Sequence, residues 1–155
     1  MKQKISALFD TSVLFGHTCR QFIFDAAYEN LCECYWSPHI IGELYRTVTA
    51  KKLKKLGFGH EKILSESSKK MMDIMEPCFY CVNSYSNIHL NLKKFIKDKD
   101  DFHLYQAAVL KRVDYIVTNN GSDLNGVKFD LEKKGIKVVD YEEFETIISI
   151  RAQSI

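Results

Sequence analysis

Short runs of apolar residues alternate along this chain with longer segments in which apolar residues recur at helical spacing. This alternation is typical of repeated βα units, in which helices cover a parallel sheet. The predicted strands span residues 5–9, 31–36, 78–82, 115–118 and 137–139. The predicted helices span residues 18–29, 38 to about 53, 60–75, 101–112, about 126–134 and 142–150. The pattern therefore predicts an α/β fold.

Two local signals define the long middle stretch of the chain. Ser37 offers an N-cap oxygen, and Pro38 follows it at a first helical position, where proline is well tolerated. The sequence Gly57-Phe58-Gly59 should end this helix and separate it from the next one. We expect the two helices to form a hairpin.

The composition is that of a folded, soluble protein. The chain has 155 residues, of which 46% are hydrophobic and 27% are charged, so we expect one domain over residues 1–155. No segment approaches the length of apolar sequence that a membrane span requires, and no signal peptide is evident, so we expect a cytoplasmic protein.

The charge is close to balanced, with a formal net charge of +2. Binding to nucleic acid would therefore depend on local basic patches rather than on overall attraction. One such patch comprises Lys51, Lys52, Lys54 and Lys55, in the helix that also carries Glu43. A solvated helix face is an equally good interpretation of these lysines.

Five cysteines, an odd number, favour reduced thiols. Cys32 and Cys34, and likewise Cys78 and Cys81, fall in apolar, aromatic-rich segments that we interpret as core strands. A closed zinc site made of these four thiolates is the less favoured alternative, because the Cys-x-Cys spacing matches zinc ribbons poorly. Aromatic side chains at Trp36, Tyr80, Tyr85, Phe95 and Tyr105 are also interpreted mainly as core, with base stacking as the alternative.

Acidic and amide side chains recur where the predicted strands end or the following helices begin. They are Asp10, Glu43, Asp100, Asp101, Asn120 and Asp123. Right-handed crossovers would bring them to one edge of a parallel sheet, although each acid alone would pass as a helix cap, a turn residue or an exposed helix position. Carboxylates packed together repel one another by about 4 kcal/mol per pair at about 4 Å, so a cation is expected. Oxygen ligands favour Mg²⁺ or Mn²⁺.

These residues occur in motifs that resemble the PIN domain. The motifs are Asp10-Thr11-Ser12-Val13-Leu14, Ser37 to Leu44 with Glu43, Asp98-Lys99-Asp100-Asp101 followed by Ala107-Ala108, and Ile116-Val117-Thr118-Asn119-Asn120. Within the family, the chain is most similar to the branch of VapC toxin ribonucleases. The resemblance implies a three-layer αβα fold, a five-stranded parallel sheet in the order 3-2-1-4-5, and metal-dependent endoribonuclease activity.

The resemblance also implies roles for individual residues. Asp10, Glu43 and Asp101 match the family's first three acids, and Asp100 is expected to assist as a further metal ligand. At the fourth position an acid is commoner than Asn120, so Asp123 is the candidate replacement carboxylate. Catalysis is expected from Asp10, Glu43, Asp101, Asn120 and Asp123, and metal binding from Asp10, Glu43, Asp100, Asp101 and Asp123. Thr11, Ser12 and Thr118 are expected to hydrogen-bond the carboxylates or the scissile phosphate.

The function that follows is hydrolysis of RNA phosphodiester bonds, by the toxin of a type II toxin–antitoxin system. Expected partners are single-stranded or structured RNA, an antitoxin protein and a second copy of the chain, with no membrane. The alternatives are a catalytically weak or inactive PIN-like RNA- or protein-binding module, and an RNA-processing nuclease. His39 and His103 are left out of the catalytic set, and His103, about 200° around its helix from Asp101, is expected to face elsewhere.

Overall fold

Five short strands pair side by side at the centre of the protein. The computed structural model describes residues 4–57 and 59–154. Its strands are β1 (Ile5–Phe9), β2 (Cys32–Trp36), β3 (Phe79–Cys81), β4 (Tyr115–Val117) and β5 (Lys137–Val139). They form one sheet in the order β3-β2-β1-β4-β5, and every neighbouring pair is parallel. The fold class and strand order expected from the sequence are confirmed.

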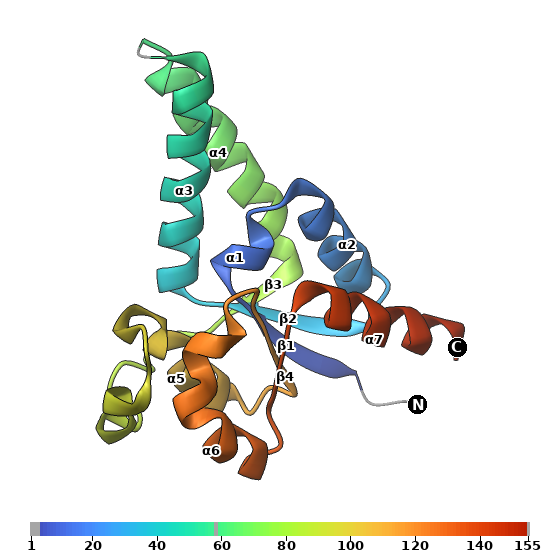
Figure 1. Cartoon of the computed structure of the whole chain (residues 1–155). Coiled ribbons are helices and arrows are strands. Elements are labelled where there is room, and N and C mark those ends of the chain that lie inside the picture. Colours follow the sequence, from blue (N-terminus) through green and yellow to red (C-terminus); the bar gives the residue numbers. More distant parts are fainter. Residues whose placement is uncertain (1–3, 58, 155) are drawn as a thin grey trace.

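Helices cover both faces of this sheet. The α-helices are α1 (Thr11–Leu14), α2 (His17–Tyr28), α3 (Pro38–Leu56), α4 (Glu61–Met75), α5 (Phe102–Lys111), α6 (Lys128–Lys133) and α7 (Tyr141–Gln153). Short 3-10 helices are η1 (Glu76–Cys78), η2 (Leu90–Phe95), η3 (Lys99–Asp101) and η4 (Gly121–Val127). In Figure 1, α2 and α7 lie on one side of the strands and α5 and α6 on the other, giving three layers.

Aromatic side chains join the sheet to the layer of α2 and α7. Phe9 of β1 is fully buried, and its ring centroid lies 5.9 Å from that of Phe79 in β3 and 5.0 Å from that of Phe144 in α7. Phe22 of α2 also contacts Phe144 edge to face. On the opposite face, Phe102 of α5 is buried, as its apolar spacing predicts. Phe9, the last residue of β1, is therefore anchored in the core directly before Asp10.

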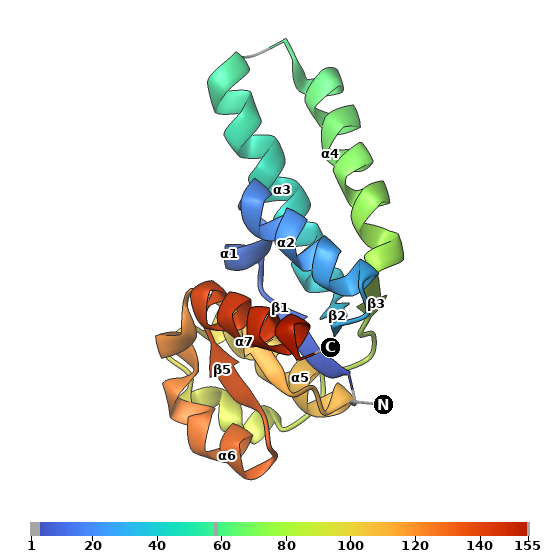
Figure 2. The same cartoon turned by 90° about the vertical axis from the view of Figure 1, so that its right-hand side faces the viewer.

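The α3–α4 hairpin projects beyond the sheet (Figure 2). Helix α3 begins as the sequence predicts, because the Ile40 amide donates to Ser37 Oγ at 3.3 Å and Pro38 occupies the first turn. Gly57 ends the helix with a φ of +79°, a conformation that glycine adopts without strain. Phe58 lies outside the described residues. None of the helices within the described ranges is long and apolar enough to cross a bilayer.

Two predictions of buried aromatic side chains are wrong. Trp36 and Tyr105 are buried as expected, but the side chains of Tyr80 and Phe95 are 59% and 54% exposed. Tyr80 lies in β3, which is an edge strand with a neighbour on one side only. Phe95 belongs to η2, a 3-10 segment where the sequence pattern predicts no element.

The cysteine pairs also differ from the expectation. Cys32 and Cys34 are buried in β2, but Cys78 lies half-buried in η1 and Cys81 is exposed at the end of β3. The second pair therefore does not belong to a core strand, and that prediction is wrong. The physical reason is again the edge position of β3, because only one neighbouring strand covers it.

Candidate metal centre

Asp10 lies where β1 ends, at the carboxyl edge of the sheet. Its side chain is 4% exposed, and Oδ2 accepts hydrogen bonds from Ser12 Oγ and Thr118 Oγ1, each at 2.8 Å. Asp10 occupies the N-cap position of α1, yet its side chain makes no capping hydrogen bond. Helix capping therefore does not explain this acid. Helix α1 itself was not predicted, because four residues are too few to show a helical period.

Glu43 reaches the same edge from α3. Thr11 Oγ1 donates to Glu43 Oε2 at 3.1 Å, so the residue directly after Asp10 holds this second carboxylate. Thr11 is buried, whereas Glu43 is partly exposed. The arrangement ties α3 to the end of β1 through a polar contact at the site rather than through packing alone.

Three further carboxylates gather around the start of α5. Asp98, Asp101 and Asp123 each offer an oxygen, and these atoms all lie within 4.8 Å of one another. Asp98 also accepts from the Asp100 amide at 3.0 Å, which fixes the turn of η3. Asp123 comes from η4, beyond β4. Asp98 and Asp101, which are one 3-10 turn apart, thus meet Asp123, which lies more than 20 residues further along the chain.

The cluster differs from the sequence-based set in one member. Asp98 was not among the predicted ligands, although a spacing of three residues places it above Asp101 on a 3-10 turn. Asp100, which was predicted to assist, is exposed and lies outside this cluster. Instead it lines a separate pocket of about 400 Å³ together with Lys93 and Tyr85.

The electrostatics of Asp101 reflect its surroundings. Burial is the largest effect, and with the charge of Asp10, a hydrogen bond with Asp123 and the charge of Asp98 it raises the pKa of the Asp101 carboxyl to about 7. Each of these influences favours the protonated form. Without a cation, the cluster therefore holds a proton near neutral pH. A bound divalent cation would replace that proton and offset the repulsion.

The loop after β4 is fixed to α1, the short helix that follows β1. The Asn119 backbone amide donates to Ser12 Oγ at 3.0 Å, and the Asn120 backbone amide donates to Thr118 Oγ1 at 3.1 Å. The Asn120 side chain is exposed. The Asn120 backbone carbonyl accepts a hydrogen bond from the Asp123 backbone amide at 3.0 Å, which positions the acid three residues further on. Of these two residues, Asp123 is the one whose side chain joins the acidic cluster.

His103 faces a site residue, contrary to the sequence-based expectation. It is 7% exposed on α5, and its ring stacks on that of His39 from α3 with centroids 3.7 Å apart. Ligand atoms of His39, Glu43 and His103 lie within 4.8 Å of one another. Burial, followed by the charge of His39, lowers the pKa of His103 to about 3. The spacing of two residues at the start of α5 correctly places His103 away from Asp101. It does not show that α3 packs against the side of α5 that carries His103.

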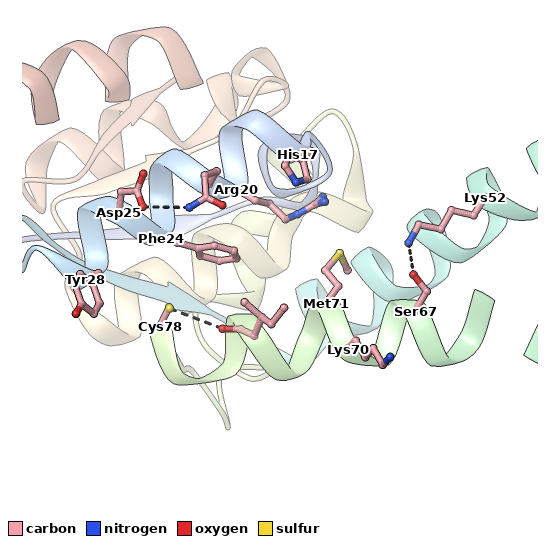
Figure 3. A pocket seen from close by; sticks show the side chains of 12 residues that line it. His17, Arg20, Phe24, Asp25, Tyr28, Lys52, Ser67, Lys70, Met71 and Cys78 are labelled. Carbon is pink, nitrogen blue, oxygen red and sulfur yellow. Dashed lines mark hydrogen bonds between the residues drawn. The ribbon is translucent and has the colours of Figure 1, made fainter. Parts of the chain in front are cut away.

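The carboxylates are not at the hollow shown in Figure 3. That hollow, of about 570 Å³, lies between α2 and α4 and has apolar walls from Phe24, Met71 and Cys78. Lys52 at its margin donates to Ser67 Oγ at 2.7 Å. None of the acids at the sheet edge lines it, so the size of a cavity does not locate the candidate centre.

The donor set at the sheet edge suits a hard divalent cation. Its atoms are carboxylate oxygens with hydroxyl groups beside them, which are the ligands that Mg²⁺ and Mn²⁺ prefer. Comparison with known proteins agrees with this chemistry: the family model described as the PIN domain matches residues 6–122. The predicted site residues from Asp10 to Asn120 all fall inside the matched span, and Asp123 lies one residue beyond it. No curated protein matches the chain.

Proposed function

The chain belongs to the PIN-domain family, and from this premise we propose that it is an endoribonuclease that hydrolyses RNA phosphodiester bonds with Mg²⁺ or Mn²⁺. PIN domains are generally metal-dependent nucleases. The observation that carries the proposal is the acidic cluster, in which Asp101 is hydrogen-bonded to Asp123 and lies within the influence of Asp98 and Asp10. Such an arrangement is unfavourable without a cation.

The residues that would hold the cation are Asp10, Glu43, Asp98, Asp101 and Asp123. When bound, a divalent cation in such a site supplies an activated water and neutralises charge on the phosphate. The protein's own part is positioning: Ser12 and Thr118 hold Asp10, and Thr11 holds Glu43. These donors are uncharged hydroxyl groups, so they orient the carboxylates without supplying a counter-charge.

The RNA would approach along α3. Lys54 and Lys55 occupy the last turn of this helix and are exposed, and Lys51 lies over the Phe15 ring with 4.4 Å between Nζ and the centroid. Lys54 is 11 residues from Glu43, which is close to a whole number of turns, so the two share a helix face. Phosphate contacts of this kind position single-stranded or structured RNA without reading its sequence.

The physiological role that we propose is that of a toxin in a type II toxin–antitoxin system. In this role residues 1–155 act as one PIN domain in the cytoplasm, as a homodimer, and an antitoxin protein covers the acidic edge. The likeness of the four motifs to the VapC branch supports this role. An RNA-processing nuclease with the same chemistry is the alternative that differs only in its biological setting.

A second candidate function is a PIN-like module that binds RNA or protein without cutting. The observation that favours it is Asn120, an amide with an exposed side chain at a position where a carboxylate is commoner. The position of Asp123 beside Asp101 argues against this alternative, because it restores the missing charge to the cluster.

The test is RNA cleavage by the purified chain in Mg²⁺, in Mn²⁺ and in excess chelator. We expect cleavage with either metal, none in chelator, and none from Asp10→Asn in any condition. Asp25→Asn, an exposed acid on α2, is the matched control and should cleave normally. Expression of the active chain should arrest growth, and Asp10→Asn should not. Cleavage that persists in chelator would show that the metal mechanism is wrong.

A further inference from the structure

The contact between α3 and α5 contains an unusual pair of side chains. His39 and His103 stack with ring planes 25° apart, and His103 is almost completely buried. Within residues 4–57 and 59–154, neither ring nitrogen of His103 has a hydrogen-bond partner. A buried polar group without a partner typically costs about 1–3 kcal/mol, so an imidazole in this condition requires an explanation.

The groups that surround His103 supply one. Glu43 lies one helical turn beyond His39 on the same face of α3, and ligand atoms of all three residues lie within 4.8 Å of one another. A neutral imidazole ring has one nitrogen with a lone pair that can bind a metal ion, and a carboxylate beside it provides negative charge. Two histidines with one carboxylate form a set of three protein ligands that leaves a coordination position open.

We propose that His39, His103 and Glu43 form a second metal site, which takes a transition-metal ion of the Zn²⁺ class. Imidazole nitrogen selects Zn²⁺, Co²⁺ or Ni²⁺ over Mg²⁺, whereas the all-oxygen cluster around Asp101 has the opposite preference. The site differs in ligands from the acidic cluster and shares with the proposed nuclease centre only Glu43. It does not depend on RNA cleavage.

The surroundings of the pair allow an ion to enter. Both histidines line the pocket of about 400 Å³ that also contains Tyr85 and Gln106. The His39 ring is exposed, so it can turn from the stacked arrangement to direct a nitrogen at an ion. The buried His103 ring is the fixed ligand, and Glu43 is held through Thr11.

Zinc titration of the intact chain, followed by calorimetry and by melting temperature, tests the site. Millimolar Mg²⁺ is kept present so that the oxygen sites are occupied. The variants are His39→Gln, which alters an exposed ring, and His103→Phe, which keeps a buried aromatic ring but removes both nitrogens. His17→Gln, an exposed histidine on α2, is the matched control.

We expect one Zn²⁺ ion to bind and to raise the melting temperature, with an affinity that falls about 100-fold or more in each of the two site variants. His17→Gln should bind as the unaltered chain does. Co²⁺ should give visible bands without the near-ultraviolet sulfur band of thiolate ligands. Asp101→Asn should lose stabilisation by Mn²⁺ and keep that by Zn²⁺, which separates this site from the nuclease centre.

Three results would each overturn the inference. The first is the absence of Zn²⁺ binding. The second is binding of equal strength in His39→Gln and in the unaltered chain, which would assign the ion to the thiols or to the acidic cluster. The third is a Co²⁺ spectrum dominated by sulfur ligation.

Discussion

The carboxyl groups of two aspartates in this protein have pKa values shifted in opposite directions. Asp101 lies among other acids, and its pKa is raised to about 7 by burial and by the charges of its neighbours. Burial also acts to raise the pKa of Asp130, but hydrogen bonds from Tyr105 and Lys134 outweigh it, and the pKa lies below its usual range. Lys134 Nζ is 2.9 Å from Asp130.

The difference separates structural acids from candidate functional ones. Asp130 has its counter-charge in Lys134, at the C-cap of its own helix, and accepts a hydrogen bond from Tyr105, so it needs no further ligand. In the Asp101 cluster the neighbouring groups are like charges, and the hydrogen bond to Asp123 requires a shared proton. A fold that retains such a cluster is arranged for a ligand that supplies positive charge.

The largest expected effect that separates the two aspartates is on catalysis. Asp101→Asn should lower the rate of RNA cleavage by about 1,000-fold or more, because it removes a charged ligand of the cation that activates the water. Asp130→Asn, the matched control, should cleave within about threefold of the unaltered chain, since a partly exposed ion pair contributes little. Rates with saturating Mn²⁺ provide the measurement. Equal losses in the two variants would remove the distinction.

The next effect is the pH dependence of Mn²⁺ binding. The cation must displace the proton that Asp101 holds below a pKa of about 7. The apparent affinity should therefore rise about tenfold per pH unit between pH 5 and pH 7 and level off above it. Calorimetric titration across this range is the measurement. An affinity that is constant from pH 5 to pH 8 would show that Asp101 is not a ligand.

A smaller effect is expected on the free energy of unfolding, measured in excess chelator. Replacing Asp101 and replacing Asp130 should change it in opposite directions. The folded-state pKa of Asp101 is raised, so the native state binds more protons between its unfolded value and pH 7, and stability falls as pH rises through this window. At pH 8, Asp101→Asn should raise the free energy of unfolding by about 1–2 kcal/mol, after allowing for solvent screening.

Asp130 should show the reverse. Its depressed pKa contributes stability above the unfolded value, and this contribution is lost as pH falls through the folded one. Asp130→Asn should therefore lower the free energy of unfolding at pH 8, by up to about 1 kcal/mol. Urea unfolding of both variants gives the two signs. Stabilisation by both substitutions, or by neither, would contradict the electrostatic argument.

Sequence patterns predicted the parallel sheet because each strand is a short apolar run between helical segments, and the Ser37-Pro38 start of α3 is confirmed. They did not predict Asp98 or the position of His103. Asp98 belongs to a 3-10 turn, which is too short to show a period. The direction of His103 is meaningful only once α3 is known to pack against it, and the sequence does not contain that tertiary contact.

The smallest expected effect concerns the hydroxyl that orients Asp10. Ser12 Oγ donates to Asp10 Oδ2 at 2.8 Å and accepts from the Asn119 backbone amide at 3.0 Å, so one atom links Asp10 and α1 to the loop after β4. Ser12→Ala should cost about 1 kcal/mol of stability and lower cleavage about tenfold, because Thr118 still holds the same carboxylate oxygen.

A second hydroxyl, that of Thr146, serves as a control for the loss of a hydrogen bond away from the acidic cluster. Thr146 Oγ1 donates to the Glu142 carbonyl within α7, a helix that contributes no acid to the cluster, so Thr146→Ala should leave cleavage unchanged. Ser12→Thr should restore most of the activity, since its hydroxyl can bond to Asp10. Cleavage by Ser12→Ala at the unaltered rate would mean that Thr118 alone positions Asp10, and that the link between α1 and the loop after β4 is structural.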